Sequence, residues 1–165
     1  MNHSYEITIV IPNYNNEDYI EQCVESAVNQ SYPYKKIIIV DDCSTDHSRE
    51  IITKLSARYD IISYVFLAKN QGVSNARNTG LANVNTEYVT FIDSDDYYYN
   101  KKTIANDMNL IKRYQEKNID IIAYSLTTHV DKSGKNVLYT QSSHKISKAH
   151  GMATLQLLSG LVQYP

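Results

Sequence analysis

Short apolar runs alternate with amphipathic stretches along the first 125 residues of the chain. The runs are rich in Ile and Val, and each of the first four is followed by apolar positions spaced three and four residues apart. The first pattern predicts β-strands and the second predicts helices. The predicted strands cover residues 7–11, 36–40, 61–67, 88–92 and 119–125. The predicted helices follow at about 17–30, 45–59, 72–84 and 102–116, with Asn15 or Asn16 capping the first and Ser44 or Thr45 the second.

This alternation predicts an α/β fold, in which a mostly parallel, doubly wound sheet is flanked by helices. After residue 125 the pattern changes. Two β-rich stretches, 126–130 and 136–140, enclose a Lys-Ser-Gly-Lys turn and predict a β-hairpin. Ser147 is a candidate cap for a last helix, which would carry several leucines. We therefore expect a core at 1–125 and a different, incomplete region at 126–165.

Composition narrows the classes of protein without selecting one. A chain of 165 residues is long enough for one ordinary domain. Its net charge of −2 gives no support to a nucleic-acid partner. Cys23 and Cys43 have neither metal-site spacing nor a disulfide pattern, which favours a reducing cytoplasm, and Cys23 falls on the apolar face of a helix. The apolar run 7–11 is too short for a signal peptide or a membrane span, and peripheral membrane association stays open.

Polar residues gather where the predicted strands end. In an open α/β sheet, ligands bind beyond the carboxyl ends of the strands. The first strand leads into Pro12 and Tyr14, the second into Asp41-Asp42, and the fourth into 93–96, which reads Asp-Ser-Asp-Asp. Carboxylates from two strand ends would repel one another unless a cation or a ligand rich in donors lay between them. The sequence therefore predicts a binding site at this edge.

Asp93 and Asp95 are two residues apart, so an extended backbone would point both side chains the same way. Two such carboxylates suit Mn²⁺ or Mg²⁺. Each motif alone also has an ordinary structural interpretation. A D-x-D is commonly a solvated turn, Asp41-Asp42 commonly caps a helix, Tyr14 is commonly a packing residue, and Arg77 commonly forms a surface salt bridge.

The joint pattern is more specific than its parts. The blocks TIVIPNYNN, IIIVDDCSTD, NQGVSNARNTGLANV and YVTFIDSDD occur in that order and resemble the family 2 glycosyltransferases, which have the GT-A fold, over roughly residues 5 to 100. The resemblance implies a nucleotide-sugar site in which Pro12 and Tyr14 lie against the base and Asp42 accepts a hydrogen bond from the base, with Asp41 beside it. Asn70, Gly72 and Arg77 would border the nucleotide and its phosphates. Asp93 would lie nearer the ribose and Asp95 on the metal, with Ser94 between the two carboxylates and Asp93 as a second metal residue.

The resemblance also implies an activity. Such enzymes transfer a sugar from a nucleotide diphosphate sugar, most often UDP-linked, to a saccharide or lipid-linked acceptor, with inversion. The implied setting is bacterial surface polysaccharide synthesis, in the cytoplasm or at the inner face of the membrane. Inversion needs a general base, which in this family is a carboxylate downstream of the D-x-D. No Asp or Glu follows Asp131, and His144 and His150 are predicted surface residues. We therefore expect donor binding with poor transfer by this chain.

Other classes remain to be weighed. A phosphoreceiver-like signalling domain also places an acidic pair at a strand end, although here Asp41-Asp42 follow the second predicted strand rather than the first. A non-catalytic nucleotide-binding module fits the chain length. A dinucleotide-dependent oxidoreductase is disfavoured because no G-x-G-x-x-G follows the first strand, and a P-loop kinase is excluded by the absence of its motif.

Overall fold

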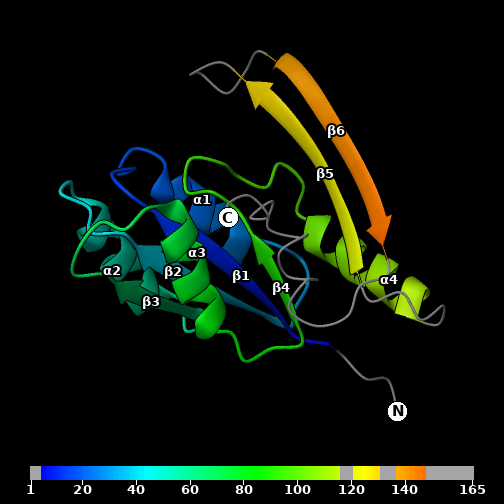
Figure 1. Ribbon diagram of the computed structural model, residues 1–165, viewed down its shortest axis with the longest axis horizontal. Coiled ribbons are helices and arrows are strands. Elements are labelled where there is room, and N and C mark those ends of the chain that lie inside the picture. Colours follow the sequence, from blue (N-terminus) through cyan, green and yellow to red (C-terminus); the bar gives the residue numbers. More distant parts are fainter. Residues whose placement is uncertain (1–4, 116–120, 131–136, 148–165) are drawn as a thin grey trace. The chain divides into compact units, whose positions relative to one another are not determined.

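The computed structural model describes residues 5–115, 121–130 and 137–147. The chain forms two compact units, residues 1–108 and 109–165, which we describe separately. Figure 1 labels their elements. The first unit and the helix that leaves it contain β1 (Ile7–Asn13), α1 (Ile20–Val28), β2 (Lys35–Asp41), α2 (Ser48–Arg58), β3 (Ile62–Phe66), α3 (Val73–Ala82), β4 (Tyr88–Phe91) and α4 (Thr103–Gln115). The second unit contains β5 (Ile121–Val130) and β6 (Val137–Ser147).

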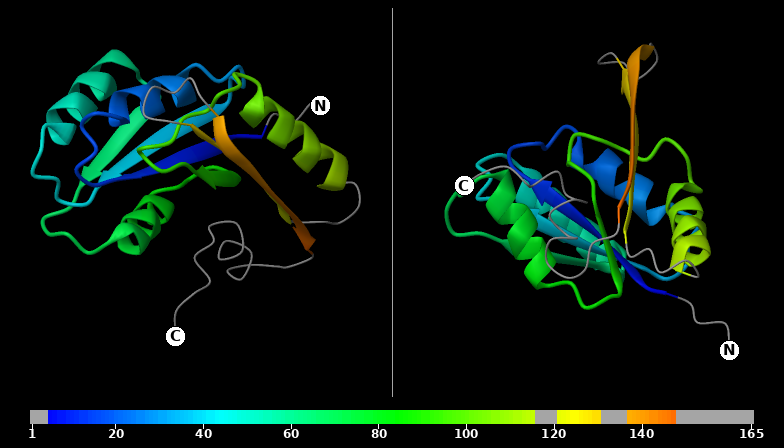
Figure 2. Two further views of the ribbon diagram at one scale, coloured as in Figure 1. Left: turned by 90° about the horizontal axis from the view of Figure 1, so that it is seen from above. Right: turned by 45° about the vertical axis from the view of Figure 1, so that its right-hand side comes forward.

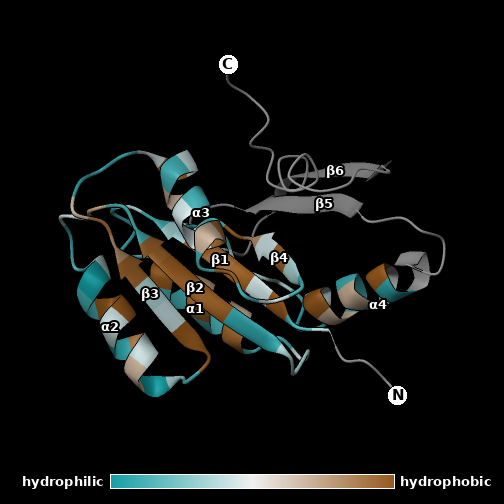
Figure 3. Cartoon of the chain, turned by 60° about the horizontal axis from the view of Figure 1, so that its bottom comes forward, coloured by the Kyte–Doolittle hydropathy of each residue, from teal (hydrophilic) through white to brown (hydrophobic). Residues whose placement is uncertain are grey.

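The first unit is built on a four-stranded sheet in the order β3-β2-β1-β4, and all its neighbouring strands are parallel. Helices α1 and α2 cover one face of the sheet, and α3 covers the other (Figure 2). The two central strands are the most apolar elements of the unit (Figure 3), because both of their faces lie under helices. This arrangement confirms the predicted α/β class.

Helix α3 packs unusually close to β1, and a glycine makes this possible. A Cβ atom at Gly80 would lie 2.3 Å from Cγ1 of Val10, well inside van der Waals contact. Ala76, one turn earlier, is also small and is buried against the same cluster as Val10 and Val40. The small residues on this face therefore let α3 lie directly on the sheet. This close packing holds the first turn of α3 near the carboxyl ends of β1 and β2.

Two helices begin later than the sequence predicts. Helix α1 has Tyr19 at its N-cap and α2 has His47, and neither cap makes a side-chain hydrogen bond. The predicted capping residues are used elsewhere, because the loops after β1 and β2 bond to each other. The side-chain oxygen of Asn15 accepts from the Thr45 amide at 2.8 Å, and Oγ of Ser44 accepts from the Asn15 amide at 2.9 Å. These loops therefore belong to the edge of the sheet rather than to the helices.

The second unit differs from the prediction for this part of the chain. The stretches predicted as a fifth parallel strand and as the first half of a hairpin form one continuous strand, β5, which pairs antiparallel with β6. The predicted fifth strand of the parallel sheet is therefore wrong. Ser147, the candidate helix cap, is instead the last residue of β6, and His144 also belongs to this strand. The predicted turn at 131–135, the last helix and His150 lie outside the described residues.

No helix in the part of the chain that the structure describes is long and apolar enough to cross a membrane.

Asp107 of α4 gives a pH-dependent prediction. Burial raises the pKa of its carboxyl from 3.8 to about 6, and within the described residues its Oδ1 has no hydrogen-bond partner. The folded state therefore keeps the proton that the unfolded state loses, so stability falls between about pH 4 and pH 6 and stays lower above that range. We expect Asp107→Asn to raise the free energy of unfolding at pH 7.5 by about 1 to 2 kcal/mol.

Urea unfolding of both proteins at pH 4 and pH 7.5 measures this effect. The two proteins should differ little at pH 4, because the folded carboxyl is protonated there and the unfolded carboxyl is only partly ionised. An equal difference at both pH values would mean that the carboxylate is not destabilising when charged.

Candidate functional site

A cleft of about 250 Å³ opens at the carboxyl edge of the parallel sheet. Every predicted site residue except Asp41 and Arg77 lines it. The full lining is Pro12, Asn13, Tyr14, Asn16, Asp42, Asn70, Gly72, Val73, Ala76, Asp93, Ser94 and Asp95. These residues come from the end of β1, the end of β2, the start of α3 and the loop after β4. The structure thus gathers four separate sequence blocks around one cavity.

Asp42 connects the end of β2 to the loop before α3. Its carboxylate accepts the backbone N–H of Gln71 at 2.9 Å and of Gly72 at 2.6 Å, and only 2% of the residue is exposed. Gly72 has φ of 88°, in the region that glycine adopts without strain. The Asp42 carboxylate therefore fixes the loop that forms one wall of the cleft.

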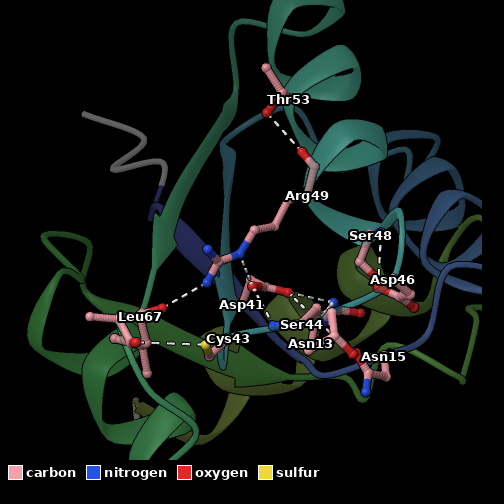
Figure 4. Close-up of polar contacts among 12 residues, drawn as sticks. Asn13, Asn15, Asp41, Cys43, Ser44, Asp46, Ser48, Arg49, Thr53 and Leu67 are labelled. Atoms are coloured by element: carbon pink, nitrogen blue, oxygen red, sulfur yellow. Dashed lines mark hydrogen bonds and ion pairs between the residues drawn. The ribbon is translucent and has the colours of Figure 1, made fainter.

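Asp41 does not line the cleft, and its side chain is fully buried. Figure 4 shows its polar contacts. Oδ1 accepts from Nε of Arg49 at 2.6 Å and from the Ser44 amide at 3.0 Å, and Oδ2 accepts from Nδ2 of Asn13 at 3.0 Å and from the Ser44 hydroxyl. Four donors already surround this carboxylate. The geometry therefore gives Asp41 a structural role, where the sequence predicted a place beside the ligand.

Arg49 is the partner of Asp41 that sequence reasoning missed. Its guanidinium also donates to the carbonyl of Leu67 at 2.7 Å and lies 4.9 Å from the centre of the Phe66 ring. One sequence signal was available. Arg49 is in the first turn of α2, where the helix dipole disfavours a positive charge, so a buried carboxylate nearby would explain its place. Arg49 joins the ends of β2 and β3 to the start of α2.

Arg77 reaches the site through Asp93. Nη2 of Arg77 lies 2.5 Å from Oδ1 of Asp93, and the Arg77 side chain is 19% exposed. Arg77 comes from α3 and Asp93 follows β4, so the ion pair ties α3 to the D-x-D segment, residues 93–95. The Arg77 guanidinium thereby offsets the negative charge of Asp93. Asp95, in contrast, is exposed, and its carboxylate has no hydrogen bond or ion pair with any side chain that the structure describes.

Two further residues hold the D-x-D segment, and sequence reasoning did not place either in the site. Nδ2 of Asn16 donates to Oγ of Ser94 at 2.7 Å. Sγ of Cys23 donates to the carbonyl of Asp93 at 3.5 Å. Burial, together with the nearby carboxylates, raises the pKa of the Cys23 thiol, so the thiol keeps the proton that it donates. Cys23 is buried as predicted, and it also supports the acidic segment.

The acidic end of the cleft suits a divalent cation that is shared with a ligand. No three His, Cys, Asp or Glu side chains converge on a metal position within the described residues. Mg²⁺, however, is commonly bound by one or two carboxylates, with phosphates and water completing its shell. The unpaired, exposed Asp95 carboxylate beside Asp93 fits this kind of site. A phosphate-bearing ligand would therefore supply the remaining oxygen atoms.

Comparison with known proteins agrees with this geometry. The family model described as Glycosyl transferase family 2 matches residues 8–162. The chain is 42% identical over 96 residues to the putative teichuronic acid biosynthesis glycosyltransferase TuaG of Bacillus subtilis, covering 58% of this chain and 38% of TuaG. It is 33% identical over 159 residues to the poly(ribitol-phosphate) beta-glucosyltransferase of Bacillus spizizenii, covering 87% and 25% of the two chains. The chain thus spans less than half the length of either relative.

Solved structures share the fold. Residues 1–349 of TarS from S. aureus, in complex with UDP-GlcNAc, match with a TM-score of 0.65 and 28% identity over 81% of this chain and 37% of that one. The mannosyltransferase PcManGT from Pyrobaculum calidifontis, in complex with GDP-Man and Mn²⁺, matches with a TM-score of 0.63 and 24% identity over 67% and 33% of the two chains. These likenesses confirm the predicted GT-A fold. Together with the family match, they exclude the alternative of a phosphoreceiver-like signalling domain.

Proposed function

The chain belongs to glycosyl transferase family 2, and on that premise we propose that its cleft binds the nucleotide diphosphate part of a sugar donor. The observation that carries this proposal is the convergence of carboxylates on one cavity. Asp42 follows β2, whereas Asp93 and Asp95 follow β4, yet all three line the same cleft. A ligand in that cleft therefore meets an acceptor from β2 and an acidic segment from β4.

The lining residues divide into a base end and a phosphate end. Tyr14 is 44% exposed and presents a ring on which a base can stack, with the buried Pro12 two residues before it. Asp42, which is acceptor-only when ionised, suits an N–H group on the edge of a base. Asn70 and Gly72 would border the nucleotide and its phosphates, and Asp93 would lie nearer the ribose. Arg77 serves the donor indirectly, by holding Asp93.

Asp95 is the residue that would hold Mn²⁺ or Mg²⁺, with Asp93 beside it. When bound, such a cation stabilises the negative charge of a departing diphosphate. Asp95 would supply one carboxylate oxygen, and the donor phosphates would supply others. The ion pair with Arg77 holds the Asp93 carboxylate in place and offsets its charge, which reduces its repulsion of the Asp95 carboxylate. The UDP-GlcNAc complex of TarS, a structure 28% identical to this chain, supports a UDP-linked donor.

The acceptor side of the reaction needs a group that the described cleft does not supply. An inverting displacement requires a general base to take the proton of the attacking hydroxyl. No Asp or Glu follows Asp131, so the base would come from outside these 165 residues, and 126–165 would begin the acceptor side. The relatives named for teichuronic acid and poly(ribitol-phosphate) support a saccharide or lipid-linked acceptor in bacterial surface polysaccharide synthesis. Such a reaction would take place in the cytoplasm or at the inner face of the membrane.

Calorimetric titration with UDP, GDP and CDP, each with and without Mn²⁺, tests the proposal. We expect one nucleotide to bind at least about tenfold more tightly with Mn²⁺, because the cation joins Asp95 to the diphosphate. Inorganic pyrophosphate with Mn²⁺ is the control, since it keeps the phosphate contacts and lacks the base. If none of the three nucleotides bound under either condition, the proposed function would be wrong.

A further inference from the structure

One hydrogen bond joins the loop after β1 to the middle of the D-x-D segment. Nδ2 of Asn16 donates to Oγ of Ser94 at 2.7 Å, across 78 positions of the sequence. Ser94 is 2% exposed, and both residues line the cleft. The bond therefore lies at the wall of the cavity.

Asn16 is itself held firmly in place. Its carbonyl accepts the backbone N–H groups of Tyr19 and Ile20, each at 3.0 Å, at the point where α1 begins. The same helix holds the chain on both sides of Ser94. Cys23 donates to the carbonyl of Asp93, and Oγ of Ser26 accepts the amide of Tyr98 at 2.9 Å. Helix α1 thus provides a rigid support to which Asn16 attaches the D-x-D segment.

The side chains of this segment are restrained unequally. The Asp93 carboxylate is held by Arg77, and the Ser94 hydroxyl is held by Asn16. The Asp95 carboxylate has no such partner within the described residues. The position of this carboxylate is therefore set by its own rotamer and by the backbone that carries it. On the N-terminal side of Asp95, the nearest side-chain restraint among the described residues is the bond between Ser94 and Asn16.

We propose that Asn16 is a positioning residue of the donor site, which directs the Asp95 carboxylate toward a shared divalent cation by holding Ser94. The inference deepens the proposed function and rests on it. Asn16 acts through Ser94, as outer residues act on the ligands of metal sites, where their loss typically lowers metal affinity about 10- to 100-fold. A pocket wall without this role would affect nucleotide affinity equally with and without the cation.

The test uses Asn16→Ala, Ser94→Ala and the double variant in the full 165-residue chain, titrated with UDP with and without Mn²⁺. We expect Asn16→Ala to lower the affinity for UDP with Mn²⁺ about tenfold and to leave the metal-free affinity nearly unchanged. Because both single variants remove the same bond, the double variant should lose little more than either one. Asn83→Ala is the matched control, since its amide donates to one carbonyl at the far end of α3.

The outcomes separate this inference from the proposed function. If wild-type chain binds UDP with Mn²⁺ and Asn16→Ala binds equally well, the positioning role is wrong and the proposed function stands. The role is also wrong if Asn16→Ala loses affinity equally with and without Mn²⁺. Should Asn16→Ala fail to fold, as judged by circular dichroism, Ser94→Ala removes the bond from its other side and decides the question. If the wild-type chain binds none of UDP, GDP and CDP, both ideas fall.

Discussion

Replacing Asp95 with asparagine should remove the Mn²⁺ dependence of nucleotide binding and so lower the affinity with Mn²⁺ by the whole enhancement, which is at least about tenfold and corresponds to about 1.4 kcal/mol or more. The reason is that the Asp95 carboxylate is exposed and has no partner among the described side chains, whereas Asp93 is already in an ion pair with Arg77. Asparagine keeps the size of the side chain and removes its charge. The measurement is calorimetric titration of UDP with and without Mn²⁺ for the wild type and the variant.

Stability distinguishes a binding defect from a folding defect. The melting temperature of Asp95→Asn should match that of the wild type, because the lost carboxylate has no partner among the described side chains. Asp60→Asn is the matched control, since Asp60 is also exposed and precedes β3, at the opposite edge of the sheet from the cleft. If Asp95→Asn kept its Mn²⁺ dependence and Asp93→Asn lost it, the cation would belong to Asp93, and the proposed role of Asp95 would be wrong.

Asp41→Asn should lower the free energy of unfolding by about 2 to 3 kcal/mol, because it removes the charge of a fully buried carboxylate that accepts from four donors, among them the partly exposed Arg49 guanidinium. The amide would also turn an N–H group toward one of the donors that now surround Asp41, which are Arg49, Ser44 and Asn13. The side chain is fully buried, so water cannot replace the lost bonds. Urea unfolding followed by circular dichroism measures the change.

Glu6→Gln is the control for this experiment. It removes the ion pair between Glu6 and Lys36, whose side chains are each 45% exposed, and such surface pairs contribute about 0 to 1 kcal/mol. Asp41→Asn should therefore be the more harmful variant by a wide margin. If Asp41→Asn instead kept wild-type stability and lost affinity for UDP, Asp41 would contact the ligand, as the sequence alone predicted.

The α/β class and the place of the site follow from the sequence, because local patterns encode them. Apolar runs with flanking amphipathic stretches can bury their surface only in a layered α/β arrangement, and parallel strands bring their carboxyl ends to one edge. That rule alone placed Pro12, Asp42 and Asp93 near one another. The helix starts were predicted less well, since the capping residues Asn15 and Ser44 are engaged between loops about 30 positions apart.

Only the tertiary structure decided what each polar side chain does. The sequence shows Asp41 and Asp42 as equivalent neighbours, yet successive residues of an extended chain point in opposite directions. One carboxylate therefore bonds to Arg49 outside the cleft lining, and the other supports the cleft wall at Gly72. The partners of Asp93 and Ser94 come from α3 and from the loop before α1, and no local pattern encodes contacts across 16 and 78 positions. Likewise, the sequence after residue 119 predicts one more strand, but only the structure shows that this strand pairs antiparallel with β6.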